Sequence, residues 1–174
     1  MSKTRAENSH LFALGLGGNV GPVEATLRHA LRQLSACLGP LRVASPYRSR
    51  AVSPVRQPDF LNTAAVGRTS LPPDAVLAVA KALERAAGRR PGPRFAPRPL
   101  DIDLLLYDAM QSADPELILP HPRLAERRFV LAPLAEIAPD LPVPPAGAPV
   151  AELLALLPAE PRVTRLEWTT CSTG

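Results

Sequence analysis

The amino-acid sequence predicts an α+β fold in which two helices cover one face of an antiparallel sheet. Segments with strand and helix patterns follow one another in the order strand, helix, strand, strand, helix, strand. Both predicted helices begin at a proline and end at a glycine. Apolar residues make up 46% of the 174 residues, enough for one compact core. This is the order of a ferredoxin-like βαββαβ core, followed here by a C-terminal extension.

The first strand is predicted over residues 10–16, which are mostly apolar and lead into the turn Gly17-Gly18-Asn19-Val20-Gly21. A helix is expected from about Pro22, because proline suits the first helical turn, and Gly39 should end it. Its apolar side chains recur every three or four residues, as on one face of a helix. They are Val23, Leu27, Ala30, Leu31, Leu34 and Leu38.

Residues 42–50 and 59–68 are predicted to form the next two strands, joined by a loop that contains proline. The second helix should begin near Pro73 and end at Gly88. Its predicted core face consists of Val76, Leu77, Val79, Ala80 and Leu83. Residues 100–107 form the most strongly predicted strand, since their apolar pattern is interrupted by aspartates alone.

A single domain is expected over residues 10–157, with short helical pieces within 133–138 and 149–157. Residues 1–9 and 158–174 show no periodic pattern and are expected to be loosely ordered.

Composition and charge argue against several classes of protein. No apolar run approaches the ~20 residues that a membrane span needs, and the N-terminus lacks the apolar centre of a signal peptide. A cytoplasmic location is therefore expected. The net charge of +4 raises nucleic acid as a partner. The arginines, however, concentrate in one short segment with few aromatics, which suits a compact polyphosphate better than a duplex.

Asp101 and Asp103 are the first candidates for chemistry. Side chains alternate along a strand, so both carboxylates share one face, while Ile102 and Leu104 point toward the helices. Two carboxylates this close repel each other unless cations lie between them. Together with substrate phosphates they are typical Mg²⁺ ligands. Taken alone, the same pattern also fits the solvent-facing side of an edge strand.

An arginine-rich segment, residues 88–98, comes directly before these aspartates. Its glycines and prolines predict a loop that can close over a ligand. A guanidinium group can donate two parallel hydrogen bonds to phosphate oxygens. Arginines that bind phosphate, next to aspartates that bind metal, are the combination that an ATP–Mg²⁺ complex requires. The alternative is a solvated basic loop. Neither a GxxxxGK[ST] motif nor the kinase motifs occur, so phosphate chemistry would need another scaffold.

A pocket for a flat heterocycle is predicted next to this site. Phe60 and Asn62 share one strand face, where an aromatic ring can stack and a carboxamide can read the edge of a ring. Phe129 could close the other side, although a core position explains it as well. His121 lies between two prolines and could contact phosphate, although a lone loop histidine is most often structural.

These residues together resemble the 6-hydroxymethyl-7,8-dihydropterin pyrophosphokinase family of folate biosynthesis. The resemblance covers residues 12–157 and is most specific at residues 94–105, Arg-Phe-Ala-Pro-Arg-Pro-Leu-Asp-Ile-Asp-Leu-Leu. Further similar motifs, in the family's order, are residues 14–21, Tyr47-Arg48-Ser49, Gln57-Pro58-Asp59-Phe60-Leu61-Asn62, Glu84 with Gly88-Arg89, Pro120-His121-Pro122, and Arg127 with Phe129.

The resemblance implies a ferredoxin-like enzyme that transfers diphosphate from ATP to the hydroxymethyl-dihydropterin and releases AMP. It implies two Mg²⁺ ions at Asp101 and Asp103, with Arg89 and Arg98 as further catalytic residues. The implied ATP contacts are Glu84, Arg89, Arg98, His121 and Arg127. The implied pterin contacts are Ser49, Val52, Phe60, Asn62 and Phe129. A monomer without a nucleic-acid or membrane partner is expected.

Two other functions are compatible with the residue patterns themselves. A metal-dependent phosphodiesterase or nuclease could use the same aspartates with water as the acceptor. A non-enzymatic ferredoxin-like module could use its basic loop to bind an acidic partner. Formation of AMP from ATP only when the pterin is present would separate the predicted enzyme from both.

Overall fold

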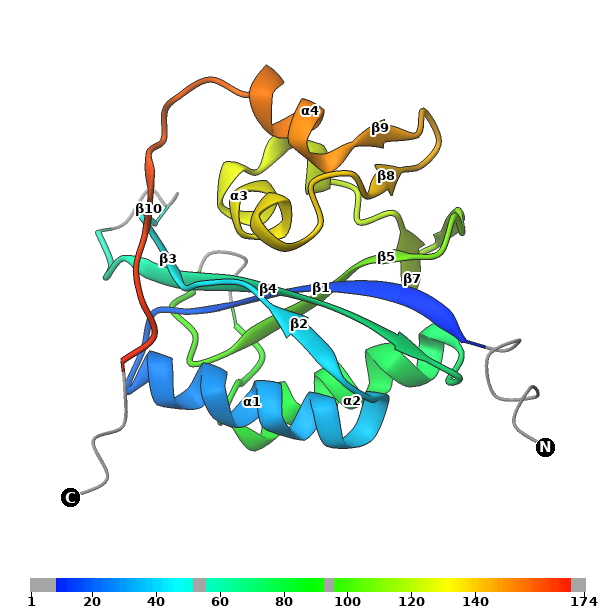
Figure 1. Ribbon diagram of the computed structural model, residues 1–174. Coiled ribbons are helices and arrows are strands. Elements are labelled where there is room, and N and C mark those ends of the chain that lie inside the picture. The colour runs from blue at the N-terminus through cyan, green and yellow to red at the C-terminus, as the bar shows by residue number, and fades with distance from the viewer. Residues whose placement is uncertain (1–8, 52–55, 93–95, 170–174) are drawn as a thin grey trace.

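A six-stranded antiparallel sheet lies at the centre of the molecule (Figure 1). The computed structural model describes residues 9–51, 56–92 and 96–169. The strand order is β10-β3-β4-β1-β5, and β2 also pairs with β4. The strands are β1 (His10–Gly18), β2 (Leu41–Val43), β3 (Tyr47–Ser49), β4 (Phe60–Thr69), β5 (Asp101–Tyr107) and β10 (Val163–Arg165).

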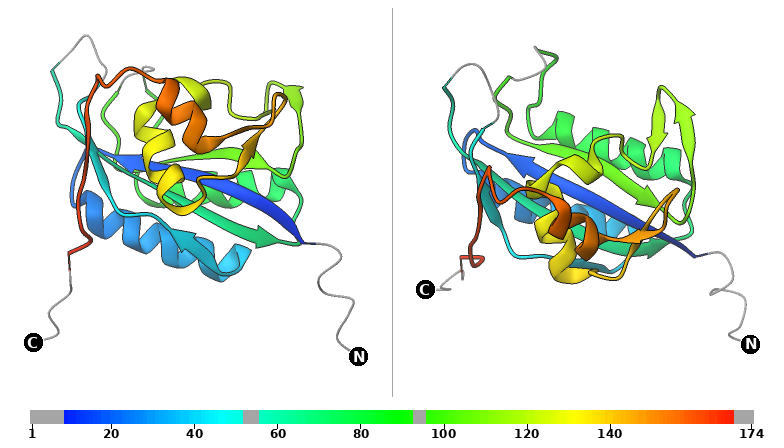
Figure 2. Two further views of the ribbon diagram at one scale, coloured as in Figure 1. Left: turned by 45° about the horizontal axis from the view of Figure 1, so that its top comes forward. Right: turned by 90° about the horizontal axis from the view of Figure 1, so that it is seen from above.

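Helices cover both faces of this sheet. The helices α1 (Val23–Leu38) and α2 (Pro73–Ala86) lie on one face, as predicted for the βαββαβ core. The C-terminal extension places α3 (Arg128–Ile137) and α4 (Val150–Leu156) on the other face, where Figure 2 shows them crossing the sheet. The predicted ferredoxin-like core is thus confirmed, and the extension adds a third layer to it.

Several short elements lie between these helices and strands. They are the hairpin of β6 (Ser112–Asp114) and β7 (Leu117–Leu119), the 3₁₀ turn Leu124–Glu126, and the pair β8 (Pro142–Val143) and β9 (Ala148–Pro149). In the part of the chain that the structure describes, no helix is long and apolar enough to cross a bilayer.

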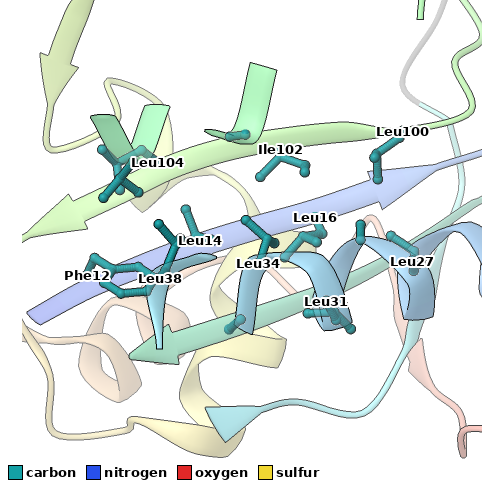
Figure 3. Close-up of a cluster of buried hydrophobic side chains, with 14 of the residues drawn as sticks. Phe12, Leu14, Leu16, Leu27, Leu31, Leu34, Leu38, Leu100, Ile102 and Leu104 are labelled. Carbon is teal, nitrogen blue, oxygen red and sulfur yellow. The ribbon is translucent and has the colours of Figure 1, made fainter. Parts of the chain in front are cut away.

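Apolar side chains fill the space on each side of the sheet. Toward α1 and α2, the core includes Phe12, Leu14 and Leu16 of β1, which pack near Leu27 and Leu34 (Figure 3). Toward α3 and α4, a second cluster consists of Ala13, Ala44, Ala64, Leu105, Leu106, Leu124, Val130, Leu131, Leu134, Ile137, Val143 and Val150. Because β1 is buried on both faces, its sequence is apolar at almost every position rather than at alternate ones.

Two segments differ from the predicted elements. The strand expected over residues 42–50 is divided into β2 and β3, with Pro46 between them, and proline has no backbone N–H to donate to a strand ladder. The C-terminal part was expected to be loosely ordered from residue 158 onward, yet Val163–Arg165 form β10, which pairs with β3 at the edge of the sheet.

Candidate active site

A cavity of about 640 Å³ opens at the end of the sheet where β1 finishes and β4 and β5 begin. The predicted site residues that line it are Ser49, Phe60, Asn62, Arg89, Arg98, Asp101, Asp103, His121, Arg127 and Phe129. Glu84 lies behind this wall, and Val52 is outside the described residues. The structure therefore brings the candidate metal, phosphate and heterocycle residues into one cavity.

The strand register explains why these residues meet. Gly17 of β1 lies opposite Asn62 on β4 and opposite Asp101 on β5, while Gly15 lies opposite Asp103. Residues directly opposite each other in a sheet project from the same face. A Cβ atom at Gly17 would lie 2.8 Å from Oδ1 of Asn62. Gly15 and Gly17 therefore leave the space between the amide of Asn62 and the two carboxylates free of side chains.

The two carboxylates occupy different electrostatic surroundings. Asp101 accepts a hydrogen bond from Arg89, and its Oδ2 lies 3.2 Å from a guanidinium nitrogen of Arg98. Asp103 lies next to His121, whose Nε2 is 3.9 Å from Oδ2, and the positive charges of Lys81 and Arg127 also act on it. Burial, and secondarily the charge of Asp101, raise the pKa of Asp103 above its ordinary value. Added positive charge would stabilise this carboxylate in its ionised form.

His121 is fixed by its backbone. Its N–H donates to the carbonyl oxygen of Leu105 at 2.9 Å, and its Nδ1 accepts from the N–H of Arg123 at 3.2 Å. Burial lowers the pKa of His121, with Asp103 opposing that effect. An imidazole that accepts at Nδ1 carries its proton at Nε2, which points toward Asp103 and can donate to an anion in the cavity.

Glu84 supports the site from behind. Its side chain is only 4% exposed, and its Oε1 accepts from the N–H of Ile102 at 2.7 Å and lies 2.5 Å from Arg89. Lys81, one turn earlier on α2, donates to the same carboxylate at 3.1 Å. Burial is the main reason why the pKa of Glu84 is raised. Glu84 thus holds Arg89 and the strand segment between the two aspartates.

Two side chains form the amide corner of the cavity. Asn62 donates from Nδ2 to Oγ of Ser49 at 2.9 Å and to the carbonyl oxygen of Tyr47 at 3.3 Å. Both Asn62 and Ser49 are buried, so the carboxamide has a fixed orientation. Phe60 and Phe129 line the same cavity, which leaves aromatic faces near an oriented amide.

A guanidinium group lies near each of these rings. The guanidinium carbon of Arg98 is 5.9 Å from the ring centroid of Phe60, and that of Arg127 is 5.7 Å from the ring centroid of Phe129. Nε of Arg98 is buried and has no hydrogen-bond partner among the described residues. Such groups prefer an anionic partner. Since Arg98 and Arg127 lie beside the two rings, the candidate heterocycle residues adjoin the candidate phosphate residues.

Two contributors were not predicted from the sequence. Asn19 is buried and donates from Nδ2 to Gln57 and to the carbonyl oxygen of Pro58, at 2.9 and 3.1 Å. Lys81 lines the cavity and pairs with Glu84. The position of Asn19, a polar residue inside a glycine-rich turn, is a signal in the sequence for a structural role. Its partners could not be identified from the sequence, because they lie tens of residues away. Lys81 looks like any exposed helical lysine in the sequence.

Comparison with known proteins identifies the family. Residues 13–139 match the family model described as 7,8-dihydro-6-hydroxymethylpterin-pyrophosphokinase. The chain belongs to this pyrophosphokinase family. A relative from Methylorubrum extorquens, named 2-amino-4-hydroxy-6-hydroxymethyldihydropteridine pyrophosphokinase, is 44% identical over 146 residues, which cover 83% of this chain and 91% of the relative. A Synechocystis protein of the same name is 41% identical over 150 residues, 85% of this chain and 76% of that protein.

Solved structures agree with the pyrophosphokinase fold. A Plasmodium falciparum HPPK-DHPS structure superimposes with a TM-score of 0.66 at 15% sequence identity. The superposition covers 87% of this chain but only 45% of that longer chain. At this identity the likeness concerns the fold, which is shared across the pyrophosphokinase family.

Proposed function

We propose that this chain transfers the diphosphate of ATP to the hydroxymethyl group of 6-hydroxymethyl-7,8-dihydropterin, releasing AMP, in folate biosynthesis. The observation that supports this most directly is the single cavity in which Asp101 and Asp103 lie between arginines and an aromatic–amide corner. Membership of the pyrophosphokinase family supports the same reaction. The comparisons support neither the phosphodiesterase nor the binding module.

Two Mg²⁺ ions are proposed at Asp101 and Asp103. In the described part of the chain no three His, Cys, Asp or Glu side chains gather as a complete metal site. The two aspartates would therefore share each ion with oxygen atoms of the substrates, as is usual for Mg²⁺. The donor set fits, because both ligands are carboxylates and the burial of Asp103 disfavours its charge without a cation. Bound Mg²⁺ would neutralise phosphate charge and acidify the acceptor hydroxyl.

The triphosphate is proposed to lie against Arg89, Arg98, His121 and Arg127. Arg89 and Arg98 are paired with Asp101 in the structure, so phosphate oxygens would replace a carboxylate as their partner. That exchange would leave the Asp101 carboxylate available to hold a metal ion. Positioning and charge neutralisation are then the main contributions of this chain to phosphoryl transfer.

The pterin is proposed to stack between Phe60 and Phe129, with Asn62 reading its edge and Ser49 orienting that amide. The role expected for Glu84 becomes more specific in this proposal. Glu84 would act on ATP by positioning Arg89 rather than by direct contact, since its carboxylate is engaged on the protein side.

A direct assay tests the proposed function. The protein is mixed with ATP, Mg²⁺ and hydroxymethyl-dihydropterin, and AMP and the pterin diphosphate are measured. AMP should form only when both metal and pterin are present. AMP or phosphate released without the pterin would indicate water as the acceptor and favour the phosphodiesterase. No turnover of ATP under any of these conditions would favour a binding module.

A further inference from the structure

The residues that follow α4 contribute to the cavity although they lie beyond the part of the chain that matches the family model, which ends at residue 139. Leu157, Pro158, Glu160 and Pro161 line the same cavity as Asn62. We refer to residues 157–169 as the C-terminal segment. In Figure 1 this segment runs from α4 on one side of the sheet, past β3, to α1 on the other side.

The middle of the C-terminal segment completes the sheet beside the amide corner. β10 pairs with β3 so that Val163 lies opposite Ser49 and Arg165 lies opposite Tyr47. On its other side β3 pairs with β4, where Tyr47 lies opposite Asn62. β3 has only three residues, so without β10 it would be a short edge strand, and short edge strands are weakly held.

A carboxylate ties three elements together at this edge. Glu136 of α3 accepts hydrogen bonds from Oγ of Ser45 at 2.8 Å and from the hydroxyl of Tyr47 at 2.9 Å. Its Oε2 lies 3.4 Å from Nε of Arg165 on β10. Burial and the bond to Glu136 raise the pKa of Tyr47 to about 12, so the phenol stays a donor. This cluster holds β10 and β3 in place against α3.

The far end of the C-terminal segment is anchored on the opposite face of the sheet. The N–H of Leu166 donates to the carbonyl oxygen of Pro46 at 2.8 Å, and Nε1 of Trp168 donates to that of Ala44 at 3.0 Å. The Trp168 ring lies 5.0 Å from the guanidinium of Arg28 on α1. Glu24 of α1 accepts from the backbone and the hydroxyl of Thr169, both at 2.7 Å.

We infer that the C-terminal segment is a positioning element of the pterin site: it holds β3, and with it the Ser49–Asn62 hydrogen bond, while residues 157–161 close the cavity wall. This inference rests on the proposed function for the identity of the ligand. It assigns no direct role in phosphate binding, because Arg89, Arg98 and the aspartates lie on β5 and the segment before it, beyond β4 and β1 in the sheet.

Leu166→Pro and Trp168→Phe test this inference. The first removes the N–H that bonds to Pro46, and the second keeps a ring but removes the bond to Ala44. Glu167→Ala is the matched control, since that side chain lies between them and is 81% exposed, and an exposed ion pair such as its contact with Arg165 at 3.4 Å contributes little. Affinities for the pterin and for a non-hydrolysable ATP analogue are measured separately by calorimetry.

Leu166→Pro should weaken pterin binding about tenfold or more, Trp168→Phe should weaken it by a smaller factor, and both should change nucleotide binding less than about twofold. The control should change neither. Unchanged pterin affinity in both variants, or equal weakening of both ligands, would overturn the inference.

Hydrogen exchange provides a readout that needs no ligand and stays decisive if Leu166→Pro is poorly folded. In Trp168→Phe, the backbone amides of Tyr47 and Arg48 should exchange faster, while those of β1 stay protected. Unchanged exchange in β3 would overturn the inference. Failure of the unmodified protein to bind the pterin would count against the proposed function instead, and the exchange rates would still decide the inference.

Discussion

Asn19 and Arg98 are joined by two hydrogen bonds that involve both backbones. The N–H of Asn19 donates to the carbonyl oxygen of Arg98 at 3.0 Å, and Oδ1 of Asn19 accepts from the N–H of Arg98 at 3.0 Å. Through Nδ2 the same side chain reaches Gln57 and Pro58, which precede Phe60 in the chain. One buried amide therefore connects the proposed phosphate side of the cavity with the proposed pterin side.

Substitution of Asn19 should affect the two substrates in different ways. Asn19→Asp keeps an acceptor for Arg98 but loses the donors to Gln57 and Pro58, so it should raise KM for the pterin more than KM for ATP. Asn19→Ala loses the side-chain bonds on both sides and keeps only its backbone bond to Arg98, so it should raise both KM values, with a stability loss of roughly 1–3 kcal/mol. Steady-state kinetics and urea unfolding measure these effects. Equal KM changes in the aspartate variant would contradict the connection described here.

Removal of the Asp103 carboxylate should abolish most of the activity. Asp103→Ala is expected to lower kcat at least ~10³-fold, because a preorganised ligand for the proposed metal would be lost. Asp140→Ala is a suitable control, since Asp140 is exposed and does not line the cavity. Near-normal turnover of Asp103→Ala at saturating Mg²⁺ would contradict the metal assignment.

The ring of Phe60 should matter for the pterin rather than for ATP. Phe60→Ala is expected to weaken pterin binding about tenfold or more, because stacking and buried apolar area are both lost. Phe60→Tyr keeps the ring and should bind nearly normally. Titration of both variants with pterin and with an ATP analogue checks this, and equal losses for the two ligands would argue against stacking.

Gly18 lies where β1 passes close to the segment before β5. A Cβ atom there would meet the carbonyl oxygen of Pro99 at 2.4 Å, and a backbone atom cannot turn away as a side chain can. Gly18→Ala should therefore destabilise the protein by roughly 1–3 kcal/mol. Gly92→Ala meets only ordinary contacts, the nearest at 3.5 Å, and serves as the control. Urea unfolding at neutral pH distinguishes the two variants.

Glu136 should contribute stability in a pH-dependent way. Burial alone would raise its pKa, but hydrogen bonds from Ser45, Tyr47 and Arg165 outweigh burial and lower it below its ordinary value of 4.5. A carboxyl group with a lowered pKa in the folded state stabilises that state at neutral pH. This contribution starts to decline as the pH approaches 4.5 and is lost below the pKa of the folded state. Glu136→Gln should therefore cost roughly 1–3 kcal/mol at pH 7 and clearly less near pH 3. Urea unfolding at both pH values tests this, and an equal cost at both would contradict it.

Much of the site could be predicted because it depends on short-range rules. Alternation along a strand places Asp101 and Asp103 on one face of their strand, and Phe60 and Asn62 on one face of theirs, and the register through Gly17 makes these the same face of the sheet. The bonds of Asn19 and the pairing of β10 with β3 could not be predicted, since they join residues 38 to 118 positions apart and leave no periodic pattern. Three residues of β10 are also too few to show alternation.

The position of β5 at the end of the strand order has a consequence for how the protein behaves in concentrated solution. An edge strand offers unpaired backbone groups to which the strand of another molecule can add. In β5 two of these groups are already occupied: the N–H of Ile102 by Glu84, and the carbonyl oxygen of Leu105 by the N–H of His121. Residues that organise the cavity therefore also protect this molecule from joining its neighbours into larger sheets.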